Sequence, residues 1–374
     1  MKFKLKDIAD ITMGQSPKGQ SYNNKKDGKA FLQRRKTFGR MYPTIDTWTT
    51  EPKKIAKSGS VLMSVRAPVG DINIANDEIC IGRGLCSINA KNGNNRYLYY
   101  LLLYNKANII KKSSGTVFDS INKEQLEETI LNVHKDKEQS KIVSVLNTID
   151  EKIELNTQTN NNLYEIGKAI YQEYFENEKY TSSYEIKQLS EVTTNNRNKI
   201  DKTKEYKVLS AVNTGKLILS DDYFDKQVYS KDIGKYLNVN KNDFAYNPAR
   251  INIGSIGLND YDFNCCVSPV YVTFSVDKDY IDFFDFYFKS KRFNAEVTLR
   301  ATGSVRQALN YNDFGMIEIP YPTKEMIEKF NSSYKTIKER ININKTKISN
   351  LEQLRDTLLP KLMNGKIDLD KIEI

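Results

Sequence analysis

An internal duplication constrains the fold of this chain more than any other feature of its 374 residues. Three pairs of similar segments repeat along it: 114–122 with 302–310, 149–156 with 337–344, and 3–12 with 184–193. The first two pairs share one spacing of 188 residues. A chain built from two related units has pseudo-twofold symmetry and is suited to a partner that itself has two parts.

Two kinds of segment alternate along the chain. Residues 1–135 and 181–322 have the short runs and glycine-rich turns typical of strands, each with one apolar run suited to a buried helix. Residues 136–180 and 323–374 space their apolar side chains alternately by three and four, which is a helical period. We therefore predict two similar α+β domains, head 1 (1–135) and head 2 (181–322), each followed by a long helix.

The apolar spacing in both helical segments predicts a two-helix coiled coil. Its predicted seam positions are Ile142, Leu146, Ile149, Ile153, Asn156, Leu163 and Ile170 in the first helix, and Phe330, Tyr334, Ile337, Ile341, Asn344, Ile348, Leu351, Leu358 and Leu362 in the second. At about 1.5 Å per residue, each helix would be about 50 Å long. The alternative is two amphipathic helices, each packed on its own head.

Chain connectivity predicts that the two helices run antiparallel. Head 2 begins where the first helix ends and finishes where the second begins, and in a parallel pair these points would lie about 50 Å apart. A compact domain of that size has a radius near ~15 Å and does not span this distance. We therefore expect the heads at opposite ends of a two-helix bar. Asn156 and Asn344 occupy equivalent seam positions, where either an amide pair fixes the register or two polar residues are tolerated.

Bulk composition narrows the function only partly. A net charge of +10 and a pI near 9.1 favour a polyanionic partner such as nucleic acid, although the Lys-, Asn- and Ile-rich composition also explains this charge. No apolar run reaches the ~20 residues needed to cross a bilayer, and the first residues do not resemble a secretion signal. The four cysteines lack metal-site spacing, so we expect buried, reduced thiols in a cytoplasmic protein.

The usual catalytic motifs are missing from the sequence. His134 is the sole histidine, which excludes a His-centred triad in each repeat. No phosphate-binding loop and no glycine-rich turn for S-adenosylmethionine is present. The segment 247–250 echoes a methyltransferase loop but lacks the aromatic residue that would stack on a flipped base. Asp150, Glu151 and Lys152 fall within the heptads, where we predict a solvated or docking face. We therefore expect no catalysis, no metal and no cofactor in this chain.

A further set of motifs recurs in order along the chain: 5–17, 59–70, Gly82-Arg83-Gly84 with Leu85 and Cys86, 303–310, 319–322 and the tail 358–367. In this order, duplicated and joined by paired heptad helices, these motifs resemble the DNA-specificity subunit of type I restriction–modification systems over nearly the whole length. The resemblance implies two target-recognition domains, each reading half of a bipartite double-stranded DNA target. It also implies two methyltransferase subunits docked on the coiled coil, with S-adenosylmethionine and ATP bound by partner subunits. Whether restriction subunits join the assembly is left open.

The two heads differ where they would meet DNA. Head 1 has Phe118-Asp119 where head 2 has Arg306-Gln307, and the segment 66–70 keeps only its Arg and Gly in 250–254. This divergence predicts two different half-sites. We expect the bar to set their spacing, since successive major-groove faces recur every ~34 Å.

Base reading requires Arg, Lys, Gln or Asn near loop tips. The candidates are Gln33, Arg34, Arg35, Lys36, Arg40, Arg66 and Arg83 in head 1, and Asn247, Arg250, Arg300, Thr302, Ser304, Arg306 and Gln307 in head 2. Each arginine has an alternative role in a surface ion pair. For the whole chain, the alternatives are a self-sufficient nuclease or methyltransferase, and a protein-binding coiled-coil scaffold without DNA recognition.

Overall fold

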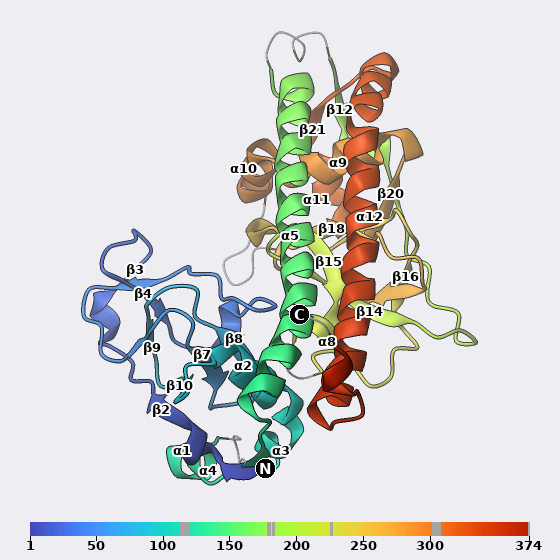
Figure 1. The fold of residues 1–374 in the computed structure, drawn as a ribbon. Helices are drawn as coiled ribbons and strands as arrows, with labels where there is room; N and C mark the ends of the chain where they lie inside the picture. The colour runs from blue at the N-terminus through green and yellow to red at the C-terminus, as the bar shows by residue number, and fades with distance from the viewer. Residues whose placement is uncertain (113–119, 178–180, 182–183, 225–226, 301–307, 373–374) are drawn as a thin grey trace. The chain divides into compact units, whose positions relative to one another are not determined.

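The computed structural model describes residues 1–374 except 113–119, 178–180, 182–183, 225–226, 301–307 and 373–374. The duplicated segments 114–117 and 302–305 therefore lie outside the described residues. The chain divides into two compact units (Figure 1). Unit 1 comprises residues 1–158 and 344–374, and unit 2 comprises residues 159–343. This division differs from the four segments predicted above, because each long helix contributes one part to each unit.

The described residues of unit 1 form three sheets. The four-stranded antiparallel sheet has the order β2 (Ala9–Met13), β10 (Leu85–Ala90), β7 (Val61–Ser64) and β8 (Ile72–Ile74). The five-stranded sheet has the order β3 (Tyr22–Asn23), β5 (Trp48–Thr49), β4 (Lys29–Leu32), β9 (Ile79–Ile81) and β6 (Ile55–Ala56). Its β4–β9 pair is parallel. Strands β1 (Lys2–Lys4) and β11 (Ile130–Asn132) form the third sheet.

The helices of head 1 are α1 (Leu5–Ile8), α2 (Asn95–Tyr104), α3 (Lys106–Ile110) and α4 (Lys123–Glu127). Helix α2 is the predicted buried helix, since all six residues from Tyr97 to Leu102 are buried. It begins at Asn94, whose side chain accepts a hydrogen bond from the Tyr97 N–H at 3.1 Å and so caps the helix.

Unit 2 repeats this plan. The order β13 (Thr193–Asn195), β20 (Val272–Val276), β17 (Phe244–Tyr246), β18 (Ile256–Leu258) matches the four-stranded sheet of unit 1. A second sheet has the order β15 (Lys216–Leu219), β14 (Lys207–Val212), β19 (Cys265–Val267), β16 (Leu237–Val239), again with a parallel pair, β14–β19. Strand β12 (Glu185–Gln188) pairs with β21 (Glu318–Tyr321). The helices are α7 (Leu189–Val192), α8 (Ser220–Tyr223), α9 (Ile281–Tyr287), α10 (Lys291–Arg300) and α11 (Tyr311–Gly315). The prediction of two similar α+β domains is confirmed.

The repeat at the start of each head has a different register from the one expected. The sequence match of 3–12 with 184–193 pairs Leu5 with Ile186, whereas the structure makes Leu5 equivalent to Leu189. Both leucines open a four-residue helix with the same capping box, and their N–H groups donate to Thr129 and Ile317, which are 188 residues apart. The expected register is wrong by three residues, because the apolar residues of both segments are spaced by three (Leu5 and Ile8, Ile186 and Leu189), so the match persists after a shift of three.

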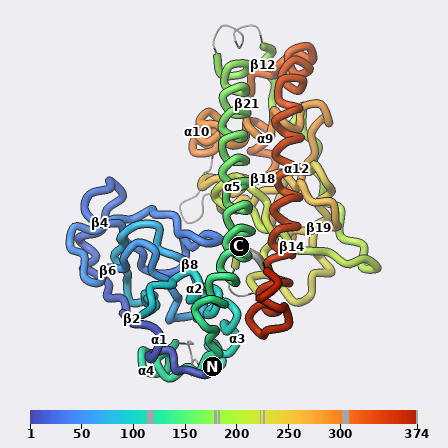
Figure 2. The backbone as a smooth tube through the Cα atoms, viewed as in Figure 1, coloured from blue at the N-terminus to red at the C-terminus, as the bar shows by residue number. Residues whose placement is uncertain are grey.

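Two forty-residue helices, α5 (Asp136–Phe175) and α12 (Lys324–Met363), contribute to both units (Figure 2). Within unit 1, Ile149 and Ile153 of α5 pack with Ile348 of α12. Within unit 2, the Asn160 Nδ2 donates to the Ile341 carbonyl at 3.3 Å. Asn160 comes after Ile153 in α5, whereas its partner Ile341 comes before Ile348 in α12. The two helices therefore run in opposite directions, and the predicted antiparallel pairing is confirmed.

One glycine allows close contact between the helices of unit 2. A Cβ added at Gly167 of α5 would lie 2.5 Å from Cε2 of Tyr334 on α12. The aromatic ring therefore occupies the space that any other residue would need.

Most of the predicted seam positions lie in core clusters that contain residues of α5 and α12. None of the sixteen is exposed. Asn344 is 1% exposed, but the Asn156 Nδ2 donates to Lys152 of its own helix at 2.6 Å. The amide-pair alternative is therefore not realised, and tolerated polar residues describe these two positions.

The ends of α5 and α12 pack into the domain cores. The prediction of a two-helix coiled coil between the heads did not include these contacts. In unit 2, Phe175 and Phe330 join a buried aromatic cluster with Phe283 of α9. In unit 1, Ile142 and Leu362 join the core that contains α2. Each helix end thus packs on its partner helix and on a head at once. None of the described helices combines the length and apolar character needed to cross a membrane.

The predicted solvated face at 150–152 is wrong for one residue. Glu151 and Lys152 are exposed, but Asp150 is 5% exposed. Its carboxylate accepts hydrogen bonds from the Tyr100 hydroxyl at 2.7 Å and from the Arg355 guanidinium at 3.1 Å. This group joins α2, α5 and α12 within unit 1.

Candidate nucleic-acid interface

Predicted DNA-contact residues of head 1 converge at one edge of the five-stranded sheet. Strands β4 and β9 are parallel, with Leu32 paired to Ile81, so their carboxyl ends lie at the same edge. Gln33 and Arg34 follow β4, and Arg83 follows β9. The Gly82 N–H donates to the Leu32 carbonyl at 2.8 Å, which holds the two exits together.

Two glycines allow the segments to approach closely. A Cβ added at Gly82 would lie 2.9 Å from Gln33 Cα, and one at Gly84 would lie 2.8 Å from the Gln33 carbonyl oxygen. The Cγ of Arg34 would lie 3.0 Å from the same Gly84 Cβ. Any side chain at these two positions would push the Gln33–Arg34 backbone away from Arg83.

Arg66 joins this group from a third segment. The Val65 N–H, directly before Arg66, donates to the Gly84 carbonyl at 2.9 Å. The backbone N–H of Arg83 donates to the Ser16 hydroxyl at 3.1 Å. We call Gln33, Arg34, Arg66 and Arg83 the arginine edge. Its backbone is held by hydrogen bonds from four separate segments of head 1.

The arginines near this edge fall into two groups. Arg34, Arg66 and Arg83 are exposed, and no carboxylate of the described residues lies within ion-pair distance of them. In contrast, Arg35 is half-buried and pairs with Asp71 at 2.5 Å, and Arg40 pairs with Glu352 of α12 at 3.1 Å. The predicted residue Lys36 is exposed. Sequence reasoning did not separate these groups, because the acidic partners are distant in the sequence.

Head 2 places fewer of its candidates together. Asn247 and Arg250 lie in the loop after β17. In this loop, the Pro248 carbonyl accepts a hydrogen bond from the Leu309 N–H at 3.0 Å. Head 1 has the equivalent hydrogen bond, from the Ile121 N–H to the Val65 carbonyl. The Asn247 side chain accepts a hydrogen bond from the Ala249 N–H at 3.1 Å, while Arg250 is exposed.

The remaining head 2 candidates do not extend this group. Arg300 pairs with Glu296 of its own helix at 3.4 Å. Thr302, Ser304, Arg306 and Gln307 lie outside the described residues.

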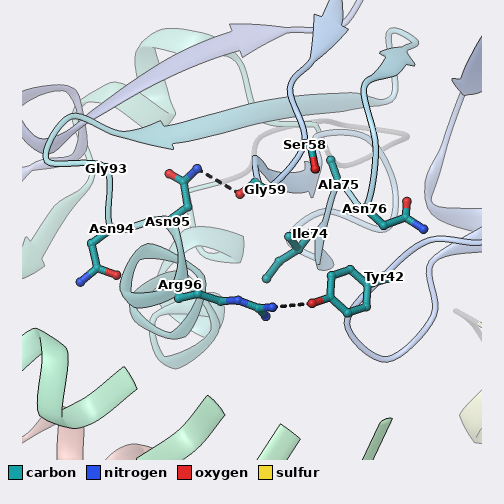
Figure 3. Close-up of a pocket in the computed structure, with 10 residues that line it drawn as sticks. All are labelled: Tyr42, Ser58, Gly59, Ile74, Ala75, Asn76, Gly93, Asn94, Asn95 and Arg96. Atoms are coloured by element: carbon teal, nitrogen blue, oxygen red, sulfur yellow. Dashed lines mark hydrogen bonds between the residues drawn. The ribbon is translucent and has the colours of Figure 1, made fainter. Parts of the chain in front are cut away.

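A hollow of about 530 Å³ lies elsewhere in head 1, at the start of α2 (Figure 3). Asn95 donates to the Gly59 carbonyl at 3.0 Å, and Arg96 donates to the Tyr42 hydroxyl. The residues that line it are Tyr42, Ser58, Gly59, Ile74, Ala75, Asn76, Gly93, Asn94, Asn95 and Arg96. None of them is a His, Cys, Asp or Glu, so the hollow lacks the side chains that usually serve as a general base near neutral pH.

The side chains most often used in catalysis have structural roles here. Burial lowers the pKa of His134, whose Nδ1 lies 2.8 Å from the Tyr97 hydroxyl. All four cysteines are buried and free, as predicted. Burial raises the pKa of Cys86 to about 12 and that of Cys265 to about 11, so these thiols are poor nucleophiles near neutral pH. Among the described residues, no group of three or more His, Cys, Asp or Glu is placed to hold a metal ion.

A second feature of functional interest lies on the long helices and was missed by the heptad pattern. Leu155 and Ile166 of α5, and Ile343 and Leu354 of α12, are 64%, 51%, 48% and 47% exposed. Leu155 corresponds to Ile343, and Ile166 to Leu354, by the 188-residue spacing. Each unit therefore presents one exposed apolar residue from each helix. The 188-residue spacing between apolar residues of the two helices was the signal in the sequence that would have identified them as equivalent pairs.

Comparisons with known proteins agree with the resemblance in the sequence. Residues 1–165 match the model of the type I restriction modification DNA specificity domain. The putative type I restriction enzyme MjaX specificity subunit of Methanocaldococcus jannaschii is 39% identical over 162 residues, which cover 43% of this chain and 38% of that protein. The matched residues thus span less than two fifths of the length of that relative.

Two further matches extend along most of the chain. The type I restriction enzyme MjaIX specificity subunit of M. jannaschii is 23% identical over 349 residues, covering 85% of this chain and 80% of that protein. The crystal structure of a type I restriction–modification system S subunit from M. genitalium has a TM-score of 0.55 at 16% identity, covering 97% of this chain and 95% of that one. At this identity, the structural match speaks for the fold alone.

Proposed function

Since residues 1–165 match the model of the type I restriction modification DNA specificity domain, we propose that this chain is a specificity subunit that recognises double-stranded DNA, each head reading one half of a bipartite target. The observation that carries this proposal is the arginine edge. Three exposed arginines and a glutamine from separate segments are held together on a backbone that glycines bring into close contact. Arginine and glutamine are side chains that read base edges in the major groove.

The chemistry of the described residues supports a non-catalytic role for this chain. The hollow at the start of α2 lacks His, Cys, Asp and Glu, the His134 Nδ1 is in hydrogen-bond distance of the Tyr97 hydroxyl, and the cysteines are buried. In this proposal, S-adenosylmethionine and ATP are bound by partner subunits. This chain supplies target selection and a docking frame.

DNA binding by this chain should depend steeply on salt. Binding that neutralises several phosphates releases their counterions, so raising salt from 50 to 200 mM should weaken binding of the full chain to a duplex by at least ~100-fold. Fluorescence anisotropy with a labelled duplex measures this slope. The scaffold alternative predicts no such binding, and a slope near zero would favour it.

We further propose that the helices dock two methyltransferase subunits, one on each unit. Support comes from the exposed apolar residues, which recur at equivalent positions in both units. Unit 1 presents Leu155 and Leu354, and unit 2 presents Ile166 and Ile343. Exposed apolar side chains mark a binding surface when they form part of a larger patch, and their equivalent places in both units fit two copies of one partner.

Altering one unit should remove one partner subunit. Leu354→Glu in unit 1, and Ile166→Glu at the equivalent position in unit 2, each place a charge in the proposed apolar contact. After co-expression with the methyltransferase subunit of the same system, native mass spectrometry should show two bound subunits for the unaltered chain. It should show one for either single variant and none for the double variant.

The control for this experiment is Leu299→Glu in α10. Leu299 is more exposed, at 76%, and lies on a different helix from the proposed docking residues. Two bound subunits are expected for this variant. Loss of both subunits from a single helix variant, or full binding by the double variant, would contradict docking of one subunit per unit.

A further inference from the structure

We propose that the half-site read by head 1 contains guanine, and that Arg34, Arg66 and Arg83 are the residues that select it. This inference rests on the proposed DNA recognition and adds the base that one head selects. Three observations support it: the choice of arginine over lysine, the absence of acidic partners among the described residues, and the fixed backbone of the arginine edge.

The residue type is informative because this chain prefers lysine. It contains 44 lysines and only 13 arginines, yet three arginines lie on segments that close backbone contacts and hydrogen bonds bring together at Gly82 and Gly84. A lysine also neutralises a phosphate, as a point charge, without the bidentate geometry that arginine offers. The planar guanidinium instead donates two parallel hydrogen bonds, which match the O6 and N7 acceptors of guanine. Arginine at all three positions therefore indicates a need for this geometry.

The three guanidinium groups are available to a ligand. Arg35, Arg40 and Arg300 are held by Asp71, Glu352 and Glu296. The described residues place no such carboxylate beside the exposed arginines of the arginine edge. Three neighbouring like charges repel one another in the free chain, and a duplex would relieve this repulsion.

The backbone of the arginine edge limits where each guanidinium can reach. All three arginines lie close to Gly84 along the backbone or in space. The Arg34 side chain lies beside Gly84, and Arg83 directly precedes it. Arg66 directly follows Val65, whose N–H donates to the Gly84 carbonyl. Neighbouring strands of a sheet are about 4.8 Å apart, and bases along one DNA strand are about 3.4 Å apart. Side chains from adjacent segments would thus address bases within a few steps of one another.

The corresponding edge of head 2 differs. After β14, β19 and β17, the described residues present Asn213, Ser268, Val270 and Asn247, with Arg250 as the one arginine in these loops. The head 1 half-site should therefore be the one in which arginine substitutions change guanine selection.

Selection from a randomised duplex library by the full chain tests this inference. The selected target should contain at least one G·C pair in one half. Arg34→Lys, Arg66→Lys and Arg83→Lys are then compared for binding to this target and to single-base variants of it. At least one substitution should weaken binding to the selected target by about 5- to 150-fold and reduce discrimination at one G·C pair of that half. The salt slope should stay nearly unchanged, because the charge is kept.

Arg292→Lys, an exposed arginine in α10, is the matched control and should leave base preference unchanged. Thermal melting of each variant checks that the fold is retained. The inference is overturned if neither selected half contains a G·C pair, or if all three substitutions leave every base preference intact. In both cases the proposed DNA recognition stands. Absence of any salt-dependent DNA binding would instead reject the proposed function, and this inference with it.

Discussion

Replacing Asp150 with alanine should lower the free energy of unfolding of unit 1 by about 3 kcal/mol. The Asp150 carboxylate accepts hydrogen bonds from Tyr100 of α2 and Arg355 of α12, and the residue is 5% exposed. Its removal leaves a largely buried guanidinium without its main counter-charge and a buried hydroxyl without its acceptor. Arg355 keeps a contact with Asp356 at 2.9 Å, which limits the loss to the lower part of the usual range. Urea unfolding followed by hydrogen exchange in α2 measures the effect.

The repeat supplies a matched control for this experiment. Lys338 occupies the position 188 residues after Asp150 and pairs with Asp282 at 2.5 Å, but its side chain is 43% exposed. Lys338→Ala should therefore cost less than about 1 kcal/mol. The double variant Asp150→Leu with Arg355→Met should recover most of the lost stability, because it removes both buried charges. Equal losses at Asp150 and Lys338 would show that burial of the carboxylate is not the cause.

The sequence predicted those features of the fold that depend on local periodicity. The seam positions repeat by three and four, and this pattern depends only on residues close in sequence. Antiparallel pairing followed from chain length and connectivity. The α+β class followed from the alternation of strand-like and helix-like segments.

Features that depend on distant partners were not predictable in this way. The seam pattern could not indicate that Phe175 and Phe330 also pack on α9, because that contact depends on the fold of head 2. The burial of Asp150 depends on Tyr100 and Arg355, one of which is 205 residues away. A charged residue beside the seam looks solvated until these partners are placed around it.

The candidate site was predicted as a set of residues but not as a surface. The arginine-rich segment 33–40 was recognised, but the parallel pairing of β4 and β9 joins segments that are distant in the sequence. This pairing brings Arg83 to Arg34, whereas Arg35 and Arg40, in the same segment, turn to acidic partners. Which arginine stays exposed is a property of the fold.

Replacing Phe330 with alanine should cost about 4 kcal/mol and lower the melting temperature of unit 2 by about 10 °C. The Phe330 side chain is fully buried, and its ring centroid lies 5.0 Å from that of Phe175 and 5.7 Å from that of Tyr334. A third neighbour, Phe286 of α9, lies at 6.2 Å. The substitution leaves a cavity that these rings fill only partly, and it removes edge-to-face contacts with Phe175 and Phe286 and a stacked contact with Tyr334. Differential scanning calorimetry measures the change.

The pattern of hydrogen exchange in the Phe330→Ala variant shows whether α5 and α12 unfold with the core of head 2 or as an independent helix pair. Because Phe330 joins α5, α9 and α12 in one cluster, protection should fall together in all three. Ile343→Ala, on the same helix but 48% exposed, should change stability by less than about 0.5 kcal/mol. If only α5 and α12 lost protection while α9 and β20 kept theirs, the helix pair would unfold as an independent bar. The helix ends would then contribute little to the core of head 2.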